Sequence, residues 1–437
     1  MKLNIRQVVS NALCCGCGAC AGSCPVKAIE MKHSAAGYLC AVCNDDVCIS
    51  CGRCLRVCPG DRGNNILDCV PEDPFCGSSL GGAIGRATDA RVRADAQSGG
   101  VVTALLTYLL KTQQIDGAIV NVWDASLCRP TAKFVDTVDG IRDAAGSYYC
   151  QTDVVQKVLQ NQDKRLAVVA LGCQTEALEL LIRCGMVKRE RVFILGLLCG
   201  GNYSGNYIDA LMGRAGINKA FRFRFKFKKG TYAGWPGDVM VDDGEHRIML
   251  PARDRTAIKG AFEAFRCYLC FDRMNCLCDI AFGDPWGIVN EENKNGNTIF
   301  LFRSERGRTI MREAVADGCI VAQQLSENTI MTGQKLSLVS ARYRLATMIA
   351  ERASWEMPPV VGRRYELPSN VRASSPALAR QMRFARDIAR MVDSRECKKR
   401  QNQVCKALYR RQWFQLRVAL FRRILTKGIR LCGVKRK

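Results

Sequence analysis

The sequence predicts an α+β protein in three parts: a small cysteine-rich domain, a mixed α/β body and a helical, basic C-terminal region. Three observations support this fold class. Two cysteine runs of equal spacing stand near the N-terminus, strand-like and helix-like segments alternate through the middle of the chain, and the pattern is helical again from about residue 333. We expect the small domain at 1–62, a connector at 63–95, the body at 96–330 and the helical region at 331–437.

The N-terminal domain is defined by two cysteine runs, C-x2-C-x2-C-x3-C, each followed by proline. In this pattern three close thiolates hold three corners of an iron–sulfur cube, and the cysteine before proline closes the neighbouring cube. A single run could instead bind zinc, which is the alternative. Two intact copies indicate a ferredoxin-like domain with two [4Fe–4S] clusters. The expected ligands are Cys14, Cys17, Cys20 and Cys58 for the first cluster, and Cys48, Cys51, Cys54 and Cys24 for the second.

The composition suits a reducing compartment. The 437 residues include 26 cysteines and 48% hydrophobic residues, so the chain can bury cores without disulfide bonds. No signal-like segment and no apolar run of membrane-spanning length is visible, so we expect a cytoplasmic protein, and clusters of this kind favour an anaerobic host. The two histidines, His33 and His246, argue against a histidine-centred hydrolase.

The body is predicted from alternating helical and strand-like segments. Ser98-Gly99-Gly100 precedes a helical run, and the strands that follow are rich in β-branched residues. The expected elements are a helix at Val101–Lys111, a strand at Ile115–Trp123, a helix at 151–160, a strand at Arg165–Leu171, a helix at Gln174–Cys184 and a strand at Arg191–Cys199. Such alternation indicates a sheet covered by helices.

Between 219 and 330 the pattern is mostly strand-like, and Phe221–Lys228 alternates phenylalanine with arginine or lysine. A period of two places the four rings on one face of a strand and the four cations on the other. We interpret this segment as a half-buried edge strand with a solvated basic face. A polyanion-binding strip is the alternative.

The C-terminal region is helical in pattern and strongly basic. From Gln401 onward there are eleven Lys or Arg and no Asp or Glu, which accounts for much of the formal charge of +24. Within Leu408–Leu431, one helical stripe is apolar and cations are interleaved, as in a basic amphipathic helix. The stripe consists of Trp413, Leu416, Leu420 and Ile424, and Phe414, Val418, Phe421 and Leu425 lie next to it. We expect it to dock on the protein's own body or on a partner. Peripheral contact with a membrane surface is the alternative, and nucleic-acid binding is not favoured.

Four cysteines beyond the N-terminal domain form a candidate third site. Cys173 and Cys199 follow two predicted strands, and Cys267 and Cys270 form a C-x2-C pair. Because the ends of neighbouring strands converge at one edge of a sheet, these thiols could hold a third cube. Buried cysteines without any ligand role are the alternative.

A series of short segments follows in fixed order over about residues 10–310. Beyond the cysteine runs they are Asp89–Arg93, Gln97–Leu106, Ile115–Ala118, Ala145–Tyr149, Gly172–Gln174, Cys199-Gly200, Cys267 with Cys270, and Asp279–Asp284. In this order they resemble the family of coenzyme F420 hydrogenase/dehydrogenase beta subunits, whose members join a two-cluster ferredoxin domain to a flavin domain.

The resemblance implies FAD in the middle domain and a third [4Fe–4S] cluster beside it, on Cys173, Cys199, Cys267 and Cys270. The segment Ser98–Gly100 at a helix start suits a pyrophosphate, because bare backbone N–H groups and the helix dipole attract anions. An ordinary helix cap is the alternative. The residues expected at the flavin are Ser98, Gly99, Gly100, Thr103, Gly146, Ser147, Tyr149 and Gln174.

Two departures from the family pattern concern the third cluster. The segment Ala170–Gln174 lacks the leading glycine and the proline that usually precede its cysteine. Two further cysteines, Cys276 and Cys278, stand close after the C-x2-C pair and could replace Cys199 as the fourth ligand. The sequence leaves this fourth ligand open.

A flavin accepts a hydride as two electrons and releases them singly, whereas iron–sulfur cubes carry one electron at a time. We therefore expect an FAD-dependent oxidoreductase that passes electrons between a hydride carrier or organic substrate, coenzyme F420 by resemblance, and a redox partner protein or ferredoxin. The alternative is an electron-transfer subunit without its own substrate, docked on a catalytic partner. The sequence identifies neither catalytic residues, nor the hydride donor, nor the direction of electron flow.

Overall fold

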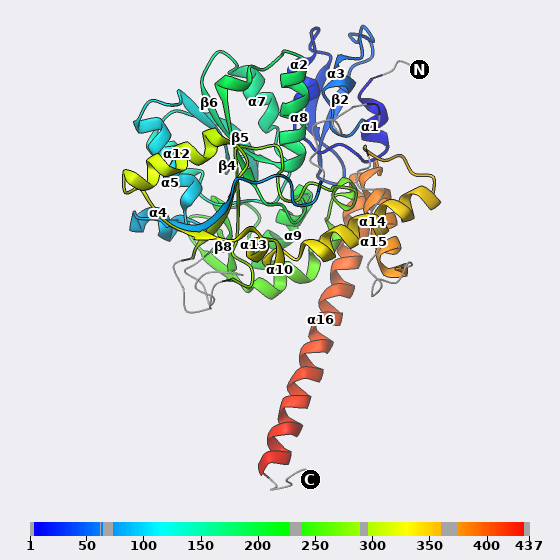
Figure 1. Cartoon of the computed structure of the whole chain (residues 1–437). Coiled ribbons are helices and arrows are strands. Elements are labelled where there is room, and N and C mark those ends of the chain that lie inside the picture. The colour runs from blue at the N-terminus through cyan, green and yellow to red at the C-terminus, as the bar shows by residue number, and fades with distance from the viewer. Residues whose placement is uncertain are drawn as a thin grey trace.

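The computed structural model describes residues 4–61, 63, 73–227, 237–288, 296–359 and 375–431, without the side chains of 226, 227 and 416–431. The described residues form a body of mixed helices and strands, from which the last helix, α16 (Ser394–Leu431), extends (Figure 1). The structure therefore confirms the predicted α+β class.

The centre of the body is an eight-stranded mixed sheet with the order β13-β3-β12-β11-β7-β6-β4-β5. The four strands β11, β7, β6 and β4 run parallel, and the outer strands pair antiparallel. The strand bounds are β3 Gly82–Ala87, β4 Gly117–Asp124, β5 Arg129–Val135, β6 Leu166–Leu171, β7 Val192–Leu197, β11 Ile280–Gly283, β12 Thr298–Phe302 and β13 Ile320–Leu325.

Helices cover both faces of this sheet. Successive residues of a strand point to opposite faces, and accordingly Ala167 packs with α5 and α12 whereas Val168 packs with α7 and α8. Burial on both faces explains why the parallel strands are continuously apolar in sequence. The covering helices are α5 Val101–Lys111, α12 Glu305–Ala316, α7 Val154–Gln160 and α8 Gly172–Arg183. The predicted alternation of helices and strands up to residue 199 is confirmed, with shifts of a few residues at the ends.

Part of the expected connector belongs to the body. Within 63–95, Gly82–Ala87 forms β3 in the main sheet, and α4 (Ala90–Asp95) follows it. The pair Gly81-Gly82 suggested a loop, but Gly82 begins β3, where a Cβ would lie 3.0 Å from the Leu325 carbonyl oxygen. Within the same strand, a Cβ on Gly85 would lie 2.5 Å from the Val321 carbonyl oxygen. The glycines of this segment therefore allow a strand to pack closely against its neighbours and do not form a turn.

A second sheet has three antiparallel strands in the order β10-β9-β8. Its edge strand β8 (Arg222–Phe227) buries Phe223 and Phe225 to 1% exposure, which confirms the predicted edge strand with a buried aromatic face. Phe221 is 59% exposed, and the side chain of Phe227 lies outside the described residues. The other bounds are β9 Asp238–Asp242 and β10 Arg247–Leu250.

The expectation that 219–330 is mostly strand is wrong in part. Three helices interrupt it: α10 (Ala252–Ile258), α11 (Phe265–Tyr268) and α12. The clearest missed start signal precedes α12, where the Ser304 hydroxyl accepts a hydrogen bond from the Gly307 N–H and caps the helix.

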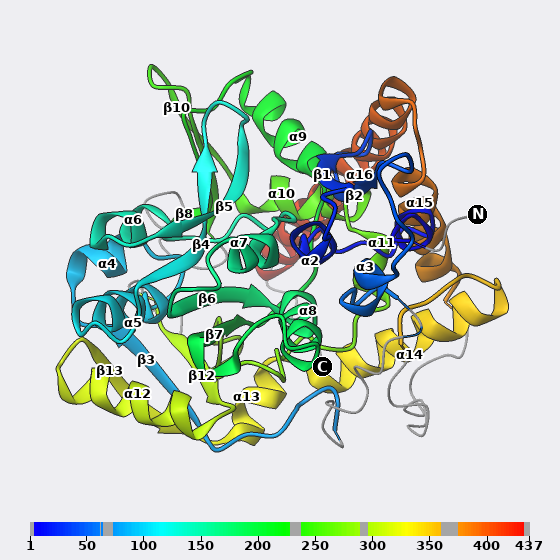
Figure 2. The same cartoon turned by 90° about the horizontal axis from the view of Figure 1, so that it is seen from above.

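The N-terminal domain contains a two-stranded antiparallel sheet and three short helices. It is docked tightly on the body, with α2 beside α7 (Figure 2). The Cys17 carbonyl accepts a hydrogen bond from the Val155 N–H at 3.0 Å, and a Cβ on Gly18 would lie 2.7 Å from Gln156 Cβ. The elements are α1 Arg6–Ser10, α2 Ala19–Ser23, β1 Ile29–His33, β2 Leu39–Cys43 and α3 Arg53–Arg56.

The C-terminal region is helical, as predicted, with α13 Glu327–Gly333, α14 Leu336–Arg352, α15 Pro376–Ala389 and α16. Leu345 of α14 and Met382 of α15 pack with α11 over the core of the N-terminal domain. The first part of α16 docks on the body, since Gln401 is buried and the Tyr409 hydroxyl donates to the Asp254 carbonyl at 3.4 Å.

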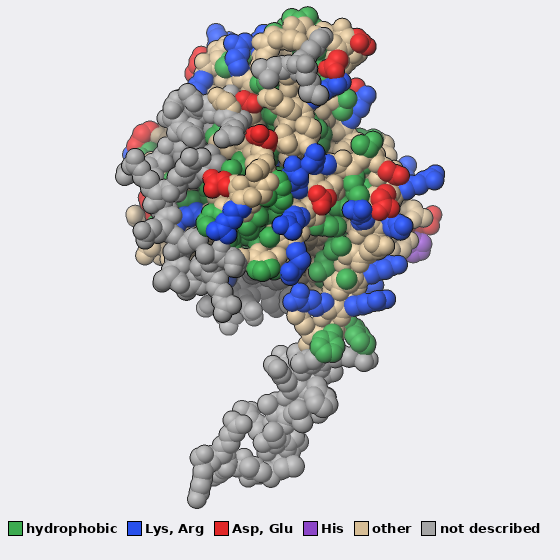
Figure 3. Space-filling model, turned by 90° about the vertical axis from the view of Figure 1, so that its right-hand side faces the viewer, with side chains coloured by type: hydrophobic (Ala, Val, Ile, Leu, Met, Phe, Trp, Pro, Cys, Tyr) green, Lys and Arg blue, Asp and Glu red, His purple; other side chains and the backbone are tan. Residues whose placement is uncertain are grey.

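Further along, α16 leaves the body with exposed cations (Figure 3). Trp413 and Phe414, which begin the predicted apolar stripe, are 55% and 65% exposed. The remaining stripe residues, Leu416, Leu420 and Ile424, have side chains outside the described set. Within the described part of the chain, we find no helix with the length and apolar character needed to cross a membrane.

Candidate iron–sulfur and flavin sites

The second predicted cluster group is assembled as the crossover pattern requires. Cys24 from the first run lines one cavity together with Cys48, Cys51 and Cys54 from the second run. Gly52, with φ +67°, turns the chain between Cys51 and the helix that carries Cys54. The structure therefore brings this predicted set together.

The first predicted group also lies together. Burial raises the pKa of the Cys20 thiol well above its ordinary value, and the nearby Cys58 and Cys14 thiols raise it further. The pKa of Cys17 is raised by its hydrogen bond with Cys15, by burial, and by Cys20 and Cys58 among its charged neighbours. In the same group, the hydrogen bond with Cys40 lowers the pKa of the Cys14 thiol. The thiols are thus close enough to affect one another's protonation, and a bound metal would take the place of their protons.

The third site is a cavity where the carboxyl ends of β6 and β7 meet the α11 segment. Four of the thiols that line it are those predicted from the sequence: Cys173, Cys199, Cys267 and Cys270. Cys276 and Cys278 lie elsewhere, in the apolar core, where the Cys278 thiol donates to the Asn275 carbonyl. The arrangement thus favours Cys199 over these two as the fourth member of the group.

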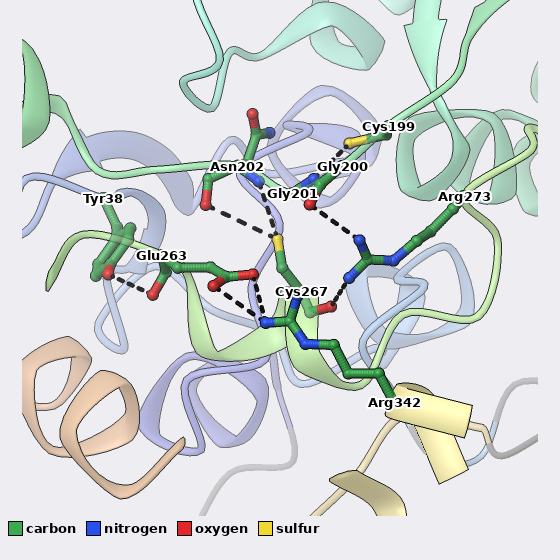
Figure 4. Close-up of polar contacts among 9 residues, drawn as sticks. All are labelled: Tyr38, Cys199, Gly200, Gly201, Asn202, Glu263, Cys267, Arg273 and Arg342. Carbon is green, nitrogen blue, oxygen red and sulfur yellow. Dashed lines mark hydrogen bonds and ion pairs between the residues drawn. The ribbon is translucent and has the colours of Figure 1, made fainter. Parts of the chain in front are cut away.

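Backbone amides point at two of these sulfurs (Figure 4). The Asn202 N–H donates to Cys267 Sγ at 3.3 Å, and the Gly201 N–H donates to Cys199 Sγ at 3.4 Å. Burial nevertheless raises the pKa of Cys267 to about 12, and also raises that of Cys199. Backbone N–H donors stabilise the negative charge of a thiolate sulfur. They would therefore favour these two cysteines as cluster ligands, because a ligand cysteine has lost its proton to the metal.

The loops around these sulfurs are held by charged side chains (Figure 4). Arg273 donates to the carbonyl oxygens of Gly200 and Cys267, at 3.0 and 3.4 Å. Arg342 donates to both carboxylate oxygens of Glu263 at 3.2 Å. The site is therefore braced from α14 as well as from the sheet.

A fifth thiol, Cys15, lines the same cavity although the sequence predicts no role for it. Its hydrogen bonds with Cys17 and with Cys173 lower its pKa well below the ordinary value. Cys15 directly follows Cys14, so the N-terminal domain reaches into the third site. Only the fold reveals this proximity, because nothing in the spacing links Cys15 to Cys173.

Among the described residues, no three His, Cys, Asp or Glu side chains are close enough to bind one metal ion together. An iron–sulfur cube requires a different ligand spacing from that of a single metal ion. A cube presents a separate iron to each thiolate, so its four ligands stand further apart than those of a single ion.

The two segments that the resemblance assigns to the flavin lie side by side. The Gln97 side-chain amide donates to the Ser147 carbonyl at 2.9 Å and to the Phe225 carbonyl at 2.8 Å. The Ser98 hydroxyl donates to the Asn297 carbonyl. Gly100 adopts φ +77° at the start of α5, and Thr103 lies in the first turn of that helix. Gly146 and Tyr149 also have positive φ, of +115° and +56°.

The glycine at position 99 has a packing reason. A Cβ there would lie 2.7 Å from the Gly85 carbonyl oxygen and 2.8 Å from the Thr298 N. This position therefore needs glycine to seat the start of α5 on β3 and β12, whether or not a cofactor approaches.

Arg224 is the residue that sequence reasoning missed here. It belongs to the predicted solvated face of β8, yet its guanidinium turns inward and its Nη1 is buried with no hydrogen-bond partner. A Cβ on Gly146 would lie 3.1 Å from this nitrogen. A buried cationic donor without an acceptor, beside the flavin segments, suits an anionic group such as a phosphate.

Gln174 has both ends of its side chain engaged within the protein. Its oxygen accepts from the Leu171 N–H at 2.9 Å, and its nitrogen donates to the Thr152 carbonyl at 3.1 Å. The side chain is 2% exposed and secures the first turn of α8 before Cys173. These two bonds give Gln174 a structural role at the start of α8, and its place at a flavin remains a prediction.

The fold and these sites define a class: a mixed α+β protein with a cysteine-rich N-terminal domain docked on a sheet-centred body. Residues 83–160 and 163–328 match the models of the N-terminal and C-terminal parts of the coenzyme F420 hydrogenase/dehydrogenase beta subunit. The chain belongs to this family. The N-terminal cysteine domain precedes the matched residues.

Individual relatives are distant. The F420-dependent formate dehydrogenase subunit beta of Methanocaldococcus jannaschii is 26% identical over 257 residues, covering 58% of this chain and 64% of that one. The coenzyme F420 hydrogenase subunit beta of Methanosarcina barkeri is 25% identical over 271 residues, covering 59% of this chain and 86% of that one. The chain thus spans less than two thirds of the formate dehydrogenase relative.

A solved structure shares the fold. A chain of the F420-reducing [NiFe] hydrogenase complex from Methanosarcina barkeri matches with a TM-score of 0.50 and 20% identity, over 69% of this chain and 99% of that chain. The match supports the mixed sheet architecture of the body.

Proposed function

We propose that this protein is an iron–sulfur flavoprotein oxidoreductase that passes electrons between a hydride carrier, coenzyme F420 by its family, and one-electron partners. One observation supports this most. The third thiol-lined cavity lies at the junction of the body and the N-terminal domain, and Cys15 of that domain lines it. Thiols that could hold three cubes are therefore neighbours within one chain.

The cavities and the neighbouring segments support the following residues as holders of the cofactors. The N-terminal domain, 1–62, would hold two [4Fe–4S] clusters, and Cys173, Cys199, Cys267 and Cys270 a third. The segments 97–100 and 146–149, with Arg224, would bind FAD. When bound, a flavin exchanges electron pairs as hydride and single electrons with clusters. The protein itself would hold the loops in place through Arg273, and the N–H groups of Gly201 and Asn202 would donate to cysteine sulfurs. Arg224 would supply a positive charge to the phosphates of FAD.

Cofactor content tests this proposal directly. The chain purified without oxygen should contain about twelve iron atoms and one FAD, because each cube holds four irons. About eight irons would leave the third site as ordinary thiols and would overturn the three-cluster proposal.

A second candidate function is an electron-transfer subunit without a substrate of its own. The exposed cations of α16 and its exposed Trp413 and Phe414 favour it, since they form a surface suited to a partner. The two functions are separated by assaying the isolated chain for oxidation of reduced F420 with a dye as acceptor. Turnover without a partner would exclude the subunit-only function.

A further inference from the structure

Arg266 connects the N-terminal domain to the third cysteine site. Its side chain is buried, at 3% exposure, and one terminal nitrogen donates to the Pro59 carbonyl at 3.2 Å. Pro59 directly follows Cys58, a proposed ligand of the first cluster. The other terminal nitrogen donates to the Leu269 carbonyl at 3.2 Å, directly before Cys270 of the third site. One guanidinium thus holds backbone beside both proposed clusters.

The charge of Arg266 has one carboxylate beside it. Glu176, which is 1% exposed, accepts from Arg266 at 3.4 Å. Glu176 lies one helical turn after Cys173. Both side chains are buried, and Arg266 lines the cavity of the third site.

The pair is incompletely satisfied within the protein. Arg266 Nε and Glu176 Oε1 are both buried without a hydrogen-bond partner. Buried donors in native proteins are normally paired. The guanidinium therefore keeps one donor unused beside a cavity that is lined by thiols.

A buried positive charge changes the reduction potential of a nearby cluster. Reduction of a cluster adds one electron and thus one negative charge, and net charge and hydrogen bonds to sulfur set its reduction potential. A fixed positive charge nearby therefore favours the reduced form. Because the site is buried, solvent and salt screen this interaction only weakly.

We propose that Arg266 is a positioning residue that raises the reduction potentials of the first and third clusters together and keeps them matched for electron transfer across the domain junction. This inference rests on the proposed function, because it requires both clusters. It goes beyond that function in assigning a shared electrostatic control to one side chain that ligates neither cluster.

The test is a redox titration of the anaerobically purified full chain, followed by electron paramagnetic resonance, on Arg266→Gln and Arg266→Lys. In Arg266→Gln, the ratio of reduced to oxidised form at a fixed potential should fall about ten-fold for two of the three clusters, equal to about 59 mV for a one-electron couple. Arg266→Lys keeps the charge, so its potentials should stay near those of the wild type.

Loss of the guanidinium leaves Glu176 unpaired, which could prevent folding. The double variant Arg266→Gln/Glu176→Gln avoids this, and its comparison with Glu176→Gln isolates the arginine charge. The matched control is Arg189→Gln. Arg189 pairs with the buried Asp279 at 2.7 Å at the opposite end of β7, roughly 20 Å away along the strand, so all potentials should stay unchanged.

Two results would overturn the inference: unchanged potentials in Arg266→Gln, or an equal fall in Arg266→Lys. Iron content is measured first on each variant. A wild-type chain with about eight irons contradicts the proposed function itself, whereas a chain with about twelve irons and unshifted potentials contradicts only the role of Arg266.

Discussion

The N-terminal domain and the third cysteine site both bring cysteines together, but the first does so through short sequence spacing and the second through the tertiary fold. In the N-terminal domain, eight thiols come from two short runs, 14–24 and 48–58, and local spacing groups them. The third site takes one thiol from the start of α8, one from the end of β7 and two from the α11 segment, with Cys15 added from the other domain. The first arrangement is visible in the sequence, whereas the second exists only once the sheet has formed.

The largest expected effect is a loss of iron from the third site without any loss from the N-terminal domain. Cys267→Ala should lose about four of twelve irons and keep the N-terminal clusters, because none of the eight ligands proposed for those clusters is changed. Cys276→Ala, which removes a buried thiol that does not line the cavity, should keep all iron. Iron and sulfide analysis measures both. Loss of four irons from Cys276→Ala alone would show that the ligand set is wrong.

A smaller effect is expected at the flavin segments. Arg224→Gln removes a buried charged donor, and a hydrogen bond to a charged group contributes about 1.5–3 kcal/mol, so FAD should bind about ten- to a hundred-fold more weakly. Arg222→Gln, which changes an exposed arginine two residues earlier on the same strand, is the control and should bind FAD normally. Fluorescence titration of the flavin-free chain gives both affinities. Equal affinities for the two variants would remove Arg224 from the site.

The smallest effect concerns Gln174. Gln174→Ala should lower the free energy of unfolding by about 1 kcal/mol, as loss of a helix cap does, and leave FAD content unchanged. The exposed Gln162→Ala serves as the control. Denaturant unfolding measures the stability and absorbance measures the flavin. Loss of FAD in Gln174→Ala at normal stability would restore the cofactor role that the sequence suggested.

Much of the fold could be predicted because local patterns agree with the tertiary structure. The helix Val101–Lys111 has an apolar face and a glycine start, and the strand Leu166–Leu171 is continuously apolar because helices cover both sides. The strand Gly82–Ala87 was missed because its glycines, which usually mark loops, serve close strand packing here.

Some residues of the candidate sites could also be predicted from the sequence, and others could not. Cys173 and Cys199 were predictable because each follows an apolar strand, and strand ends share an edge. Arg224 was not, because a period of two assigns it to the solvent face and cannot show that its guanidinium turns toward Gly146. Cys15 and Arg266 lie at a domain junction, and the sequence contains no periodic signal that would reveal this.

The central claim is that one chain joins a flavin to three clusters. An anaerobic reductive titration of the purified protein tests it most directly, because each cube takes up one electron and the flavin takes up two. We predict about five electron equivalents per chain, with flavin and cluster absorbance both bleached. An uptake of about two equivalents, without a flavin component, would match the N-terminal clusters alone and would contradict the account.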